Sequence, residues 1–217
     1  MAVACRGGWL SAISACPVEV YARIRHVVNE GDEYGFDAIP LAETALAGQR
    51  PDRLTDSEAD VIRSYTYNSH AAINKALWGE VEMTPAIEGR IRLIRSGLAK
   101  YPLERSVRVT REVEASEYGI VDADSAYALI DEDIIYHGFL STSGSAKPPH
   151  SCTRADPAIL DLVVQAGVPA LRLGDLAEMP AEKEVLVIDA RILFVVGVEW
   201  DGTRNMWRIK AIVRGGE

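Results

Sequence analysis

Two carboxylates lie one residue apart at the entrance of an apolar run near the end of the chain. Glu182 and Glu184 flank Lys183 and lead into Val185-Leu186-Val187-Ile188. Because side chains alternate along a strand, both carboxylates are expected on one face, about 7 Å apart. The protonation of two like charges this close should be coupled, and the pKa of one member should rise. Such clustering is unfavourable for the stability of a strand, so a functional role explains it better than a structural one. Carboxylates placed in this way can remove protons or stabilise a nearby cation.

Two further features of the second half carry side chains suited to chemistry. Arg111 lies on an expected strand near Glu112 and Glu114, and Ser141-Thr142-Ser143 follows Phe139-Leu140. A guanidinium fork matches phosphate oxygens. Each feature also has a structural interpretation: an exposed acidic rim for the paired glutamates, a surface ion pair for the arginine, and a cap or turn for the serines. Taken singly, none of the three predicts a function.

The elements that must position these residues change in type along the chain. A capping box at Thr55–Glu58 begins a helix that extends to Gly79, with a break near Asn68-Ser69. A second helix opens at Thr84-Pro85 and stops at Tyr101-Pro102. Beyond this point apolar residues recur at about every second position, which is typical of strands. Strands are expected at 105–111, 134–140, 159–165, 170–173, 182–188, 192–200 and 206–213, with short helices at 124–130 and 18–30.

This order of elements predicts an α+β fold rather than a doubly wound sheet. We expect one domain of 217 residues, mainly helical over 1–102 and β-rich over 103–217. A chain of this length can bury a core without disulfides. The last two strands are expected to be joined by a hairpin at Asp201-Gly202.

The composition is that of a soluble globular protein, with 48% hydrophobic and 25% charged residues. The net charge of −9 disfavours a protein that binds nucleic acid through broad counterion release. No apolar run is long enough to span a bilayer, so no membrane partner is expected. Neither the three cysteines nor the four histidines have metal-ligand spacing, which predicts a reduced cytoplasmic protein without a metal site. The apolar stretch near the N-terminus is too short for an export signal.

Taken together and in this order, the chemical residues resemble a known family. An arginine on a first strand, Arg111, is followed by the serine triplet that begins at Ser141 and then by Glu182-x-Glu184. This order resembles the R-S-E class of mono-ADP-ribosyltransferases, and is similar to the enzyme components of actin-modifying bacterial binary toxins. The resemblance implies that NAD is the co-substrate.

The resemblance extends into the helical half. Tyr65 and Asn74 resemble residues of the helix that those toxins place over the nicotinamide end of NAD. The match runs from roughly Leu54 to Phe194, which is most of the chain. It implies the ADP-ribosyltransferase fold, in which a helical lobe packs on a mainly antiparallel two-sheet β core with an NAD cleft.

The resemblance also implies a role for each residue. Glu184 reaches the ribose 2′-hydroxyl and opposes the cation that develops as nicotinamide leaves. Ser141 hydrogen-bonds Glu184 and holds its rotamer, while Arg111 binds the phosphates and Thr142 joins the NAD contacts. In the family, a glutamate at the position of Glu182 accompanies an arginine acceptor. The pKa of an arginine side chain is above about 12, so the guanidinium must lose a proton as it attacks, and Glu182 is the candidate base.

The sequence departs from the family pattern in two loops. Relatives usually have an aromatic residue and an arginine in the loop that folds over NAD, but residues 144–156 contain no aromatic except His150. Arg154 is the candidate second phosphate contact, and His150 is a candidate stacking partner. Arg108 is a rival for the phosphate role on the first strand, although it lies on the opposite face. The loop 174–181 lacks the aromatic residue with which relatives often recognise their target.

Three hypotheses about function follow. The first is transfer of ADP-ribose from NAD to an arginine side chain of a target protein, by a toxin, effector or phage enzyme that acts in a cytoplasm. The second keeps the site and changes the acceptor, giving an NAD glycohydrolase or a transferase to a nucleic acid or small molecule. The third is a catalytically silent module that only binds a partner. An immunity or inhibitor protein is a further candidate partner.

Overall fold

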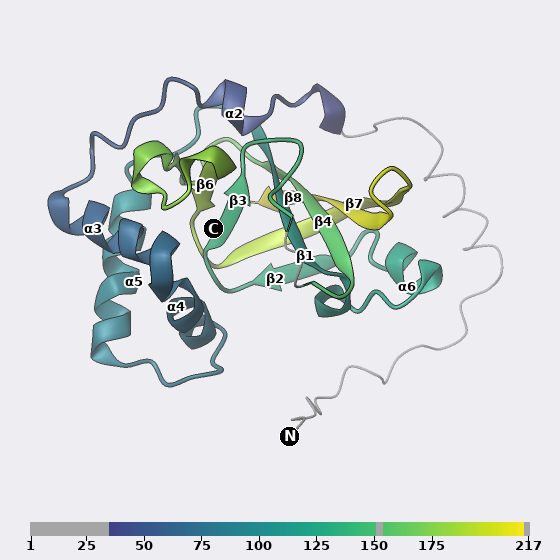
Figure 1. The fold of residues 1–217 in the computed structure, drawn as a ribbon, viewed down its shortest axis with the longest axis horizontal. Coiled ribbons are helices and arrows are strands. Elements are labelled where there is room, and N and C mark those ends of the chain that lie inside the picture. The colour runs from purple at the N-terminus through teal and green to yellow at the C-terminus, as the bar shows by residue number, and fades with distance from the viewer. Residues whose placement is uncertain (1–34, 151–153, 215–217) are drawn as a thin grey trace. The chain divides into compact units, whose positions relative to one another are not determined.

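The computed structural model describes residues 35–150 and 154–214 (Figure 1). The helix expected at 18–30 lies outside these residues. Helices dominate the first part of the described chain. They are η1 (Phe36–Ala38), α2 (Ala42–Ala45), α3 (Asp56–Ser64), the π-helical turn η2 (Tyr65–Ser69), α4 (His70–Leu77) and α5 (Pro85–Leu98).

The starts of α3 and α5 follow from their capping residues. Thr55 accepts a hydrogen bond from the Glu58 amide, and the Glu58 carboxylate accepts one from the Thr55 amide, so the predicted capping box is present. Thr84 caps α5 by accepting from the Ile87 amide, with Pro85 in the first turn. The predicted break in the first helix is the π-helical turn η2, which separates α3 from α4.

Glu58 also ties α3 to α5. Its side chain is buried, with the residue 3% exposed, and it accepts from Ser96 Oγ at 2.7 Å and forms an ion pair with Lys100. Burial alone would raise the pKa of this carboxyl, but the hydrogen bonds from Lys100, Thr55 and Ser96 outweigh it and lower the pKa to about 2.

Replacing Glu58 by alanine is expected to destabilise the fold by about 2 to 3 kcal/mol, since a cap and a buried ion pair are lost together. Because the folded-state pKa lies below the unfolded one, the contribution of Glu58 is present at neutral pH and is lost as pH falls from about 5 towards 2. Urea unfolding at several pH values measures both effects. Glu88→Ala, at an exposed position of α5, is the matched control. A destabilisation that does not shrink at low pH would contradict the assignment.

Strands dominate the second part of the described chain. Short helical turns lie between them at η3 (Ala115–Tyr118), α6 (Ala123–Tyr127), η4 (Gly174–Leu176) and η5 (Pro180–Glu182). The strands are β1 (Val107–Glu114), β2 (Asp133–Tyr136), β3 (Leu140–Ser143), β4 (Pro157–Val164), β5 (Ala170–Arg172), β6 (Glu184–Val187), β7 (Arg191–Asp201) and β8 (Met206–Arg214).

The strands form a mixed sheet in the order β2-β7-β8-β4-β1-β3-β6-β5. Among the strands described, β4 and β8 are the one parallel pair, so the sheet is mainly antiparallel, as expected. β1 and β3 are registered through the single pair Thr110↔Ser143. This pair joins a five-stranded part to the three-stranded part β3-β6-β5. The α+β prediction is therefore confirmed, and the described strands form one eight-stranded sheet in place of the two that were expected.

One predicted strand is divided into two in the structure. The run 134–140 is not one strand, because β2 ends at Tyr136 and β3 begins at Leu140. The chain turns between them, where the Phe139 amide donates to Asn74 instead of to a neighbouring strand. The serine triplet consequently lies within β3 and is not a cap or turn.

The prediction that Glu182 and Glu184 share one strand face is wrong. Glu182 ends the 3₁₀ turn η5, and β6 begins only at Glu184. Between them Lys183 has φ of 54°, a left-handed conformation that no strand residue adopts. The predicted hairpin between the last two strands is confirmed, since β7 and β8 pair antiparallel and a four-residue loop that begins at Gly202 joins them.

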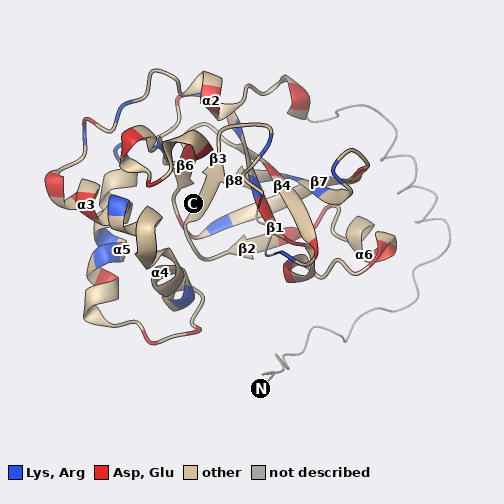
Figure 2. Ribbon diagram, viewed as in Figure 1, with Lys and Arg blue, Asp and Glu red and all other residues tan. Residues whose placement is uncertain are grey.

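The helices cover the three-stranded part of the sheet. In Figure 1, α3, α4 and α5 gather beside β3 and β6. Their apolar faces pack on Phe139, Leu171 and Leu186, while a second cluster fills the space around β1, β4 and β8. Lys and Arg are interspersed with Asp and Glu over both parts (Figure 2). Of the helices described, none is long and apolar enough to cross a membrane.

Candidate active site

A cavity of about 270 Å³ opens where β1 and β3 diverge. Apart from His150, every predicted site residue lines it, from both the helical and the β-rich part of the chain. These residues are Tyr65, Asn74, Arg111, Ser141, Thr142, Arg154, Glu182 and Glu184. Seven residues that the sequence analysis did not single out as site residues complete the lining: Thr66, His70, Thr110, Glu112, Ser143, Pro148 and Pro149.

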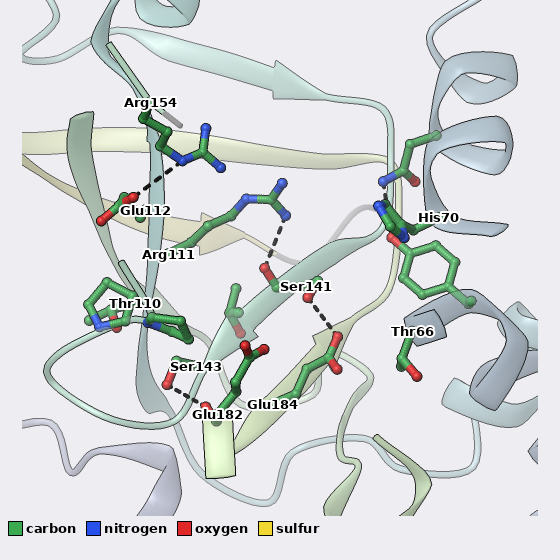
Figure 3. Close-up of a pocket in the computed structure, with 15 residues that line it drawn as sticks. Thr66, His70, Thr110, Arg111, Glu112, Ser141, Ser143, Arg154, Glu182 and Glu184 are labelled. Atoms are coloured by element: carbon green, nitrogen blue, oxygen red, sulfur yellow. Dashed lines mark hydrogen bonds and ion pairs between the residues drawn. The ribbon is translucent and has the colours of Figure 1, made fainter. Parts of the chain in front are cut away.

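Arg111 bridges the opening between the diverging strands. Its Nη1 donates to the Ser141 carbonyl at 3.0 Å (Figure 3). Within the described residues it forms no ion pair with a carboxylate, so its other N–H groups are left for a ligand in the cavity. A guanidinium so placed fits a phosphate group.

Arg108, the rival on the same strand, faces away from the cavity. Its Nε and Nη2 donate to the fully buried Asp161 at 2.7 and 2.8 Å. Arg208 donates to the same carboxylate at 2.6 Å. Arg108 thus belongs to a structural ion-pair network, and Arg111 is the strand arginine of the site.

A hydrogen bond from Ser141 fixes the Glu184 carboxylate in the cavity. Ser141 Oγ donates to its Oε1 at 2.6 Å, across the register of β3 and β6 (Figure 3). Burial raises the pKa of Glu184, and the nearby charge of Glu182 raises it further, whereas the Ser141 hydrogen bond and the Arg111 charge lower it. The net direction is upward.

Glu182 reaches the cavity from a turn that several contacts hold in place. Ser143 Oγ donates to the Glu182 carbonyl at 2.8 Å, and the Gly144 amide donates to the Lys183 carbonyl at 2.9 Å. The Lys183 ammonium forms an ion pair with Glu43 of α2. These contacts stabilise the left-handed Lys183, which turns the chain so that both carboxylates line one cavity without sharing a strand.

Tyr65 and Asn74 hold the segment that leads into β3. Tyr65 is 1% exposed, and its hydroxyl donates to the Phe139 carbonyl at 3.2 Å. Asn74 donates to the Tyr65 hydroxyl and accepts from the Phe139 amide at 3.1 Å. Both residues therefore fix the start of the strand that carries Ser141.

Thr142 and His150 differ from the predicted pattern of NAD contacts. Thr142 lines the cavity, but its hydroxyl donates to the Val185 carbonyl at 2.7 Å, between the strands. The His150 side chain is 62% exposed and is not part of the cavity lining. Its Nδ1 lies 2.8 Å from Glu112 Oε2, so the expected stacking role has no support here.

Comparison with known families decides the class of protein. The sequence model of a family described as "ADP-ribosyltransferase exoenzyme" matches residues 43–190, which is more than half of the chain. The chain belongs to this family. Members of the ADP-ribosyltransferase exoenzyme family transfer ADP-ribose from NAD, their co-substrate. The predicted resemblance is thereby confirmed.

Solved structures show the same exoenzyme fold. Plx2a, an ADP-ribosyltransferase toxin from Paenibacillus larvae, superimposes with a TM-score of 0.69 at 21% identity, over 82% of this chain and 98% of that one. C3stau2 from S. aureus, solved with NAD, has a TM-score of 0.67 at 18% identity, over 87% and 98%. BECa of a binary enterotoxin of C. perfringens, solved with NADH, has 0.68 at 20% identity, over 85% and 49%. No curated protein matches the sequence significantly.

Glu112 is the carboxylate of this exoenzyme site that the sequence did not predict. It was interpreted as a surface partner of Arg111, yet it is 7% exposed and lines the cavity. Its Oε1 lies 3.4 Å from Arg154 Nε. No pattern in the sequence around Arg111 indicates this burial. Among the described residues, no group of three or more His, Cys, Asp or Glu side chains is arranged to hold a metal ion.

Gly138 is needed for the contact between α4 and β3. A Cβ at this position would lie 2.9 Å from Asn74 Oδ1 and 3.3 Å from Trp78 Nε1. Gly138→Ala is therefore expected to displace the Asn74 amide and to lower NAD turnover by about tenfold or more. Nicotinamide release measures turnover, with Gly48→Ala as the control because nothing lies within 4 Å of its Cβ. Full activity of Gly138→Ala would show that the Asn74 contacts do not position the site.

Proposed function

We propose that this protein transfers ADP-ribose from NAD to an arginine side chain of a target protein and releases nicotinamide. The observation that carries the proposal is the pair of carboxylates in one cavity, with Glu184 fixed by a 2.6 Å hydrogen bond from Ser141 and Glu182 held in the neighbouring turn. Each carboxylate has a separate task.

Glu184 provides the charge that cleavage requires. As nicotinamide leaves, the ribose carbon becomes cationic, much as in glycoside hydrolysis. Nicotinamide departs as a neutral pyridine, so no general acid is needed. A fixed carboxylate stabilises the developing cation and accepts a hydrogen bond from the ribose 2′-hydroxyl, which is worth about 10²- to 10³-fold in rate. Ser141 limits the motion of this carboxylate, and so acts by positioning.

Arg111 and Arg154 are the proposed phosphate contacts. Both guanidinium groups line the cavity. The Nε of Arg154 lies 3.4 Å from Glu112 Oε1, and Figure 3 shows the terminal nitrogens of Arg154 directed away from that carboxylate. Two guanidinium forks match the two phosphates of a dinucleotide.

Glu182 is the proposed base for an arginine acceptor. A guanidinium must lose a proton to become a nucleophile, and its pKa in water is above about 12. A carboxylate at the mouth of the site attracts the cation and takes its proton.

We further propose that the protein acts in a cytoplasm as a toxin or effector. The support is the family and its relatives: Plx2a is described as a toxin, and BECa as an ADP-ribosylating component of a binary enterotoxin.

Incubation with a cell lysate and labelled NAD tests the proposal, with wild type and Glu184→Gln in parallel. Labelled proteins are then analysed by mass spectrometry for the modified side chain, and agmatine in a separate reaction supplies a small guanidinium acceptor. The expected result is ADP-ribose on arginine of discrete proteins, and on agmatine, with wild type only. Free nicotinamide without any labelled acceptor would contradict transfer and favour an NAD glycohydrolase.

A further inference from the structure

Glu112 is a buried acid that the proposed mechanism does not use. It lies on β1 next to Arg111, lines the cavity and is 7% exposed. A carboxylate beside the proposed phosphate contacts would repel a dinucleotide, because both are anionic. Its place in this cavity therefore needs a reason that outweighs the repulsion.

The contacts of Glu112 give that reason. Oε1 lies 3.4 Å from Arg154 Nε, and Oε2 lies 2.8 Å from His150 Nδ1. The Arg154 contact is made through Nε, at the base of the guanidinium, and not through the fork. Figure 3 shows the Arg154 fork directed away from Glu112, on the same side as the guanidinium of Arg111. The fork is thus left for a ligand.

The energetics support the same conclusion. Arg111 and Arg154 would repel each other in a small cavity, and a flexible arginine loses rotamer entropy when a ligand fixes it. A buried carboxylate at Nε compensates one charge and fixes the side chain before the ligand arrives. Such preorganisation increases affinity by lowering the ordering cost of binding.

We propose that Glu112 is a positioning residue that holds the Arg154 fork towards the phosphates of NAD. This inference rests on the proposed NAD site. A positioning role and a simple charge effect predict opposite changes in affinity when Glu112 is neutralised. Removing a negative charge near an anionic ligand should tighten binding, whereas losing the positioning contact should weaken it.

The test compares wild type, Glu112→Gln, Arg154→Ala and the double variant in the full chain. Dissociation constants are measured for ADP-ribose, which carries both phosphates, and for nicotinamide, which carries none. KM and kcat are measured for NAD hydrolysis. Glu114→Gln is the matched control, since Glu114 lies on the same strand, outside the cavity, and accepts from the Asp156 amide at 3.0 Å.

We expect Glu112→Gln to raise the KM for NAD and the dissociation constant for ADP-ribose by about five- to tenfold, with kcat within about twofold. Nicotinamide binding and the Glu114→Gln control should not change. In the Arg154→Ala background the Glu112→Gln substitution should not weaken ADP-ribose binding further, because the guanidinium that Glu112 positions is gone.

Unchanged or tighter ADP-ribose binding by Glu112→Gln would overturn the inference and leave the NAD site intact. Wild type that binds neither NAD nor ADP-ribose would overturn the proposed function and the inference with it. If Glu112→Gln fails to fold, Glu112→Asp also tests the positioning role, since aspartate keeps the charge but has a shorter side chain. It should raise KM with kcat retained, and an unchanged KM would contradict positioning.

Discussion

Glu184→Gln is expected to reduce both nicotinamide release and ADP-ribose transfer by at least about 10²- to 10³-fold. The substitution removes the charge that opposes the ribose cation and little else. A glutamine oxygen can still accept from Ser141 Oγ, which lies 2.6 Å from Glu184 Oε1. Nicotinamide release in water and transfer to agmatine, measured in the same samples, report the two activities.

The stability of the Glu184→Gln variant is its own control. Burial raises the pKa of Glu184 in the folded protein above its unfolded value. At neutral pH, above both values, the ionised carboxylate therefore opposes folding. The glutamine variant should melt at the wild-type temperature or above it, so a lost activity cannot be attributed to unfolding. Retained hydrolysis in this variant would exclude Glu184 as the charge that opposes the cation.

The same raised pKa predicts the acid limb of the wild-type activity. Only ionised Glu184 can oppose the cation, so the rate of hydrolysis should fall as pH decreases through the pKa of this residue. Because that pKa is raised, the fall should begin above the pH at which an ordinary glutamate titrates, near pH 4.3. A pH–rate profile of nicotinamide release measures it.

The part of the site that the sequence predicted depends on the order of short motifs along the chain. Arg111, Ser141 and Glu184 come from three strands that are far apart in sequence, and β1, β3 and β6 bring them to one cavity. The capping residues of α3 and α5 were predicted for a similar reason, because local hydrogen bonds determine helix starts. Such features need only the residue types and their spacing.

The part that could not be predicted depends on contacts between distant segments. Lys183 adopts a left-handed conformation because Glu43 and Gly144, about 140 and 39 residues earlier, hold its side chain and carbonyl. Strand alternation in Glu182–Glu184 therefore gave the wrong geometry. Glu112 was missed because its burial results from the divergence of β1 and β3, which no local pattern encodes.

Glu182→Gln is expected to lower transfer to an arginine side chain by about 10²- to 10⁴-fold, while nicotinamide release into water stays within about threefold of wild type. Water needs no strong base to attack a ribose cation, whereas a guanidinium must lose a proton. The side chain should stay in place, because Ser143 Oγ holds the Glu182 carbonyl, a backbone group, at 2.8 Å. The two activities would then separate in a single variant.

The pH profile of Glu182→Gln provides an independent reading. The charge of Glu182 helps to raise the pKa of Glu184, so its removal should move the acid limb of hydrolysis to lower pH. Agmatine as the acceptor avoids any effect on target docking, and Glu178→Gln, on the exposed loop before η5, is the control. Equal losses of hydrolysis and transfer would refute the division of labour between the two glutamates. An acid limb at the wild-type pH would mean that the carboxylates do not interact as their shared cavity predicts.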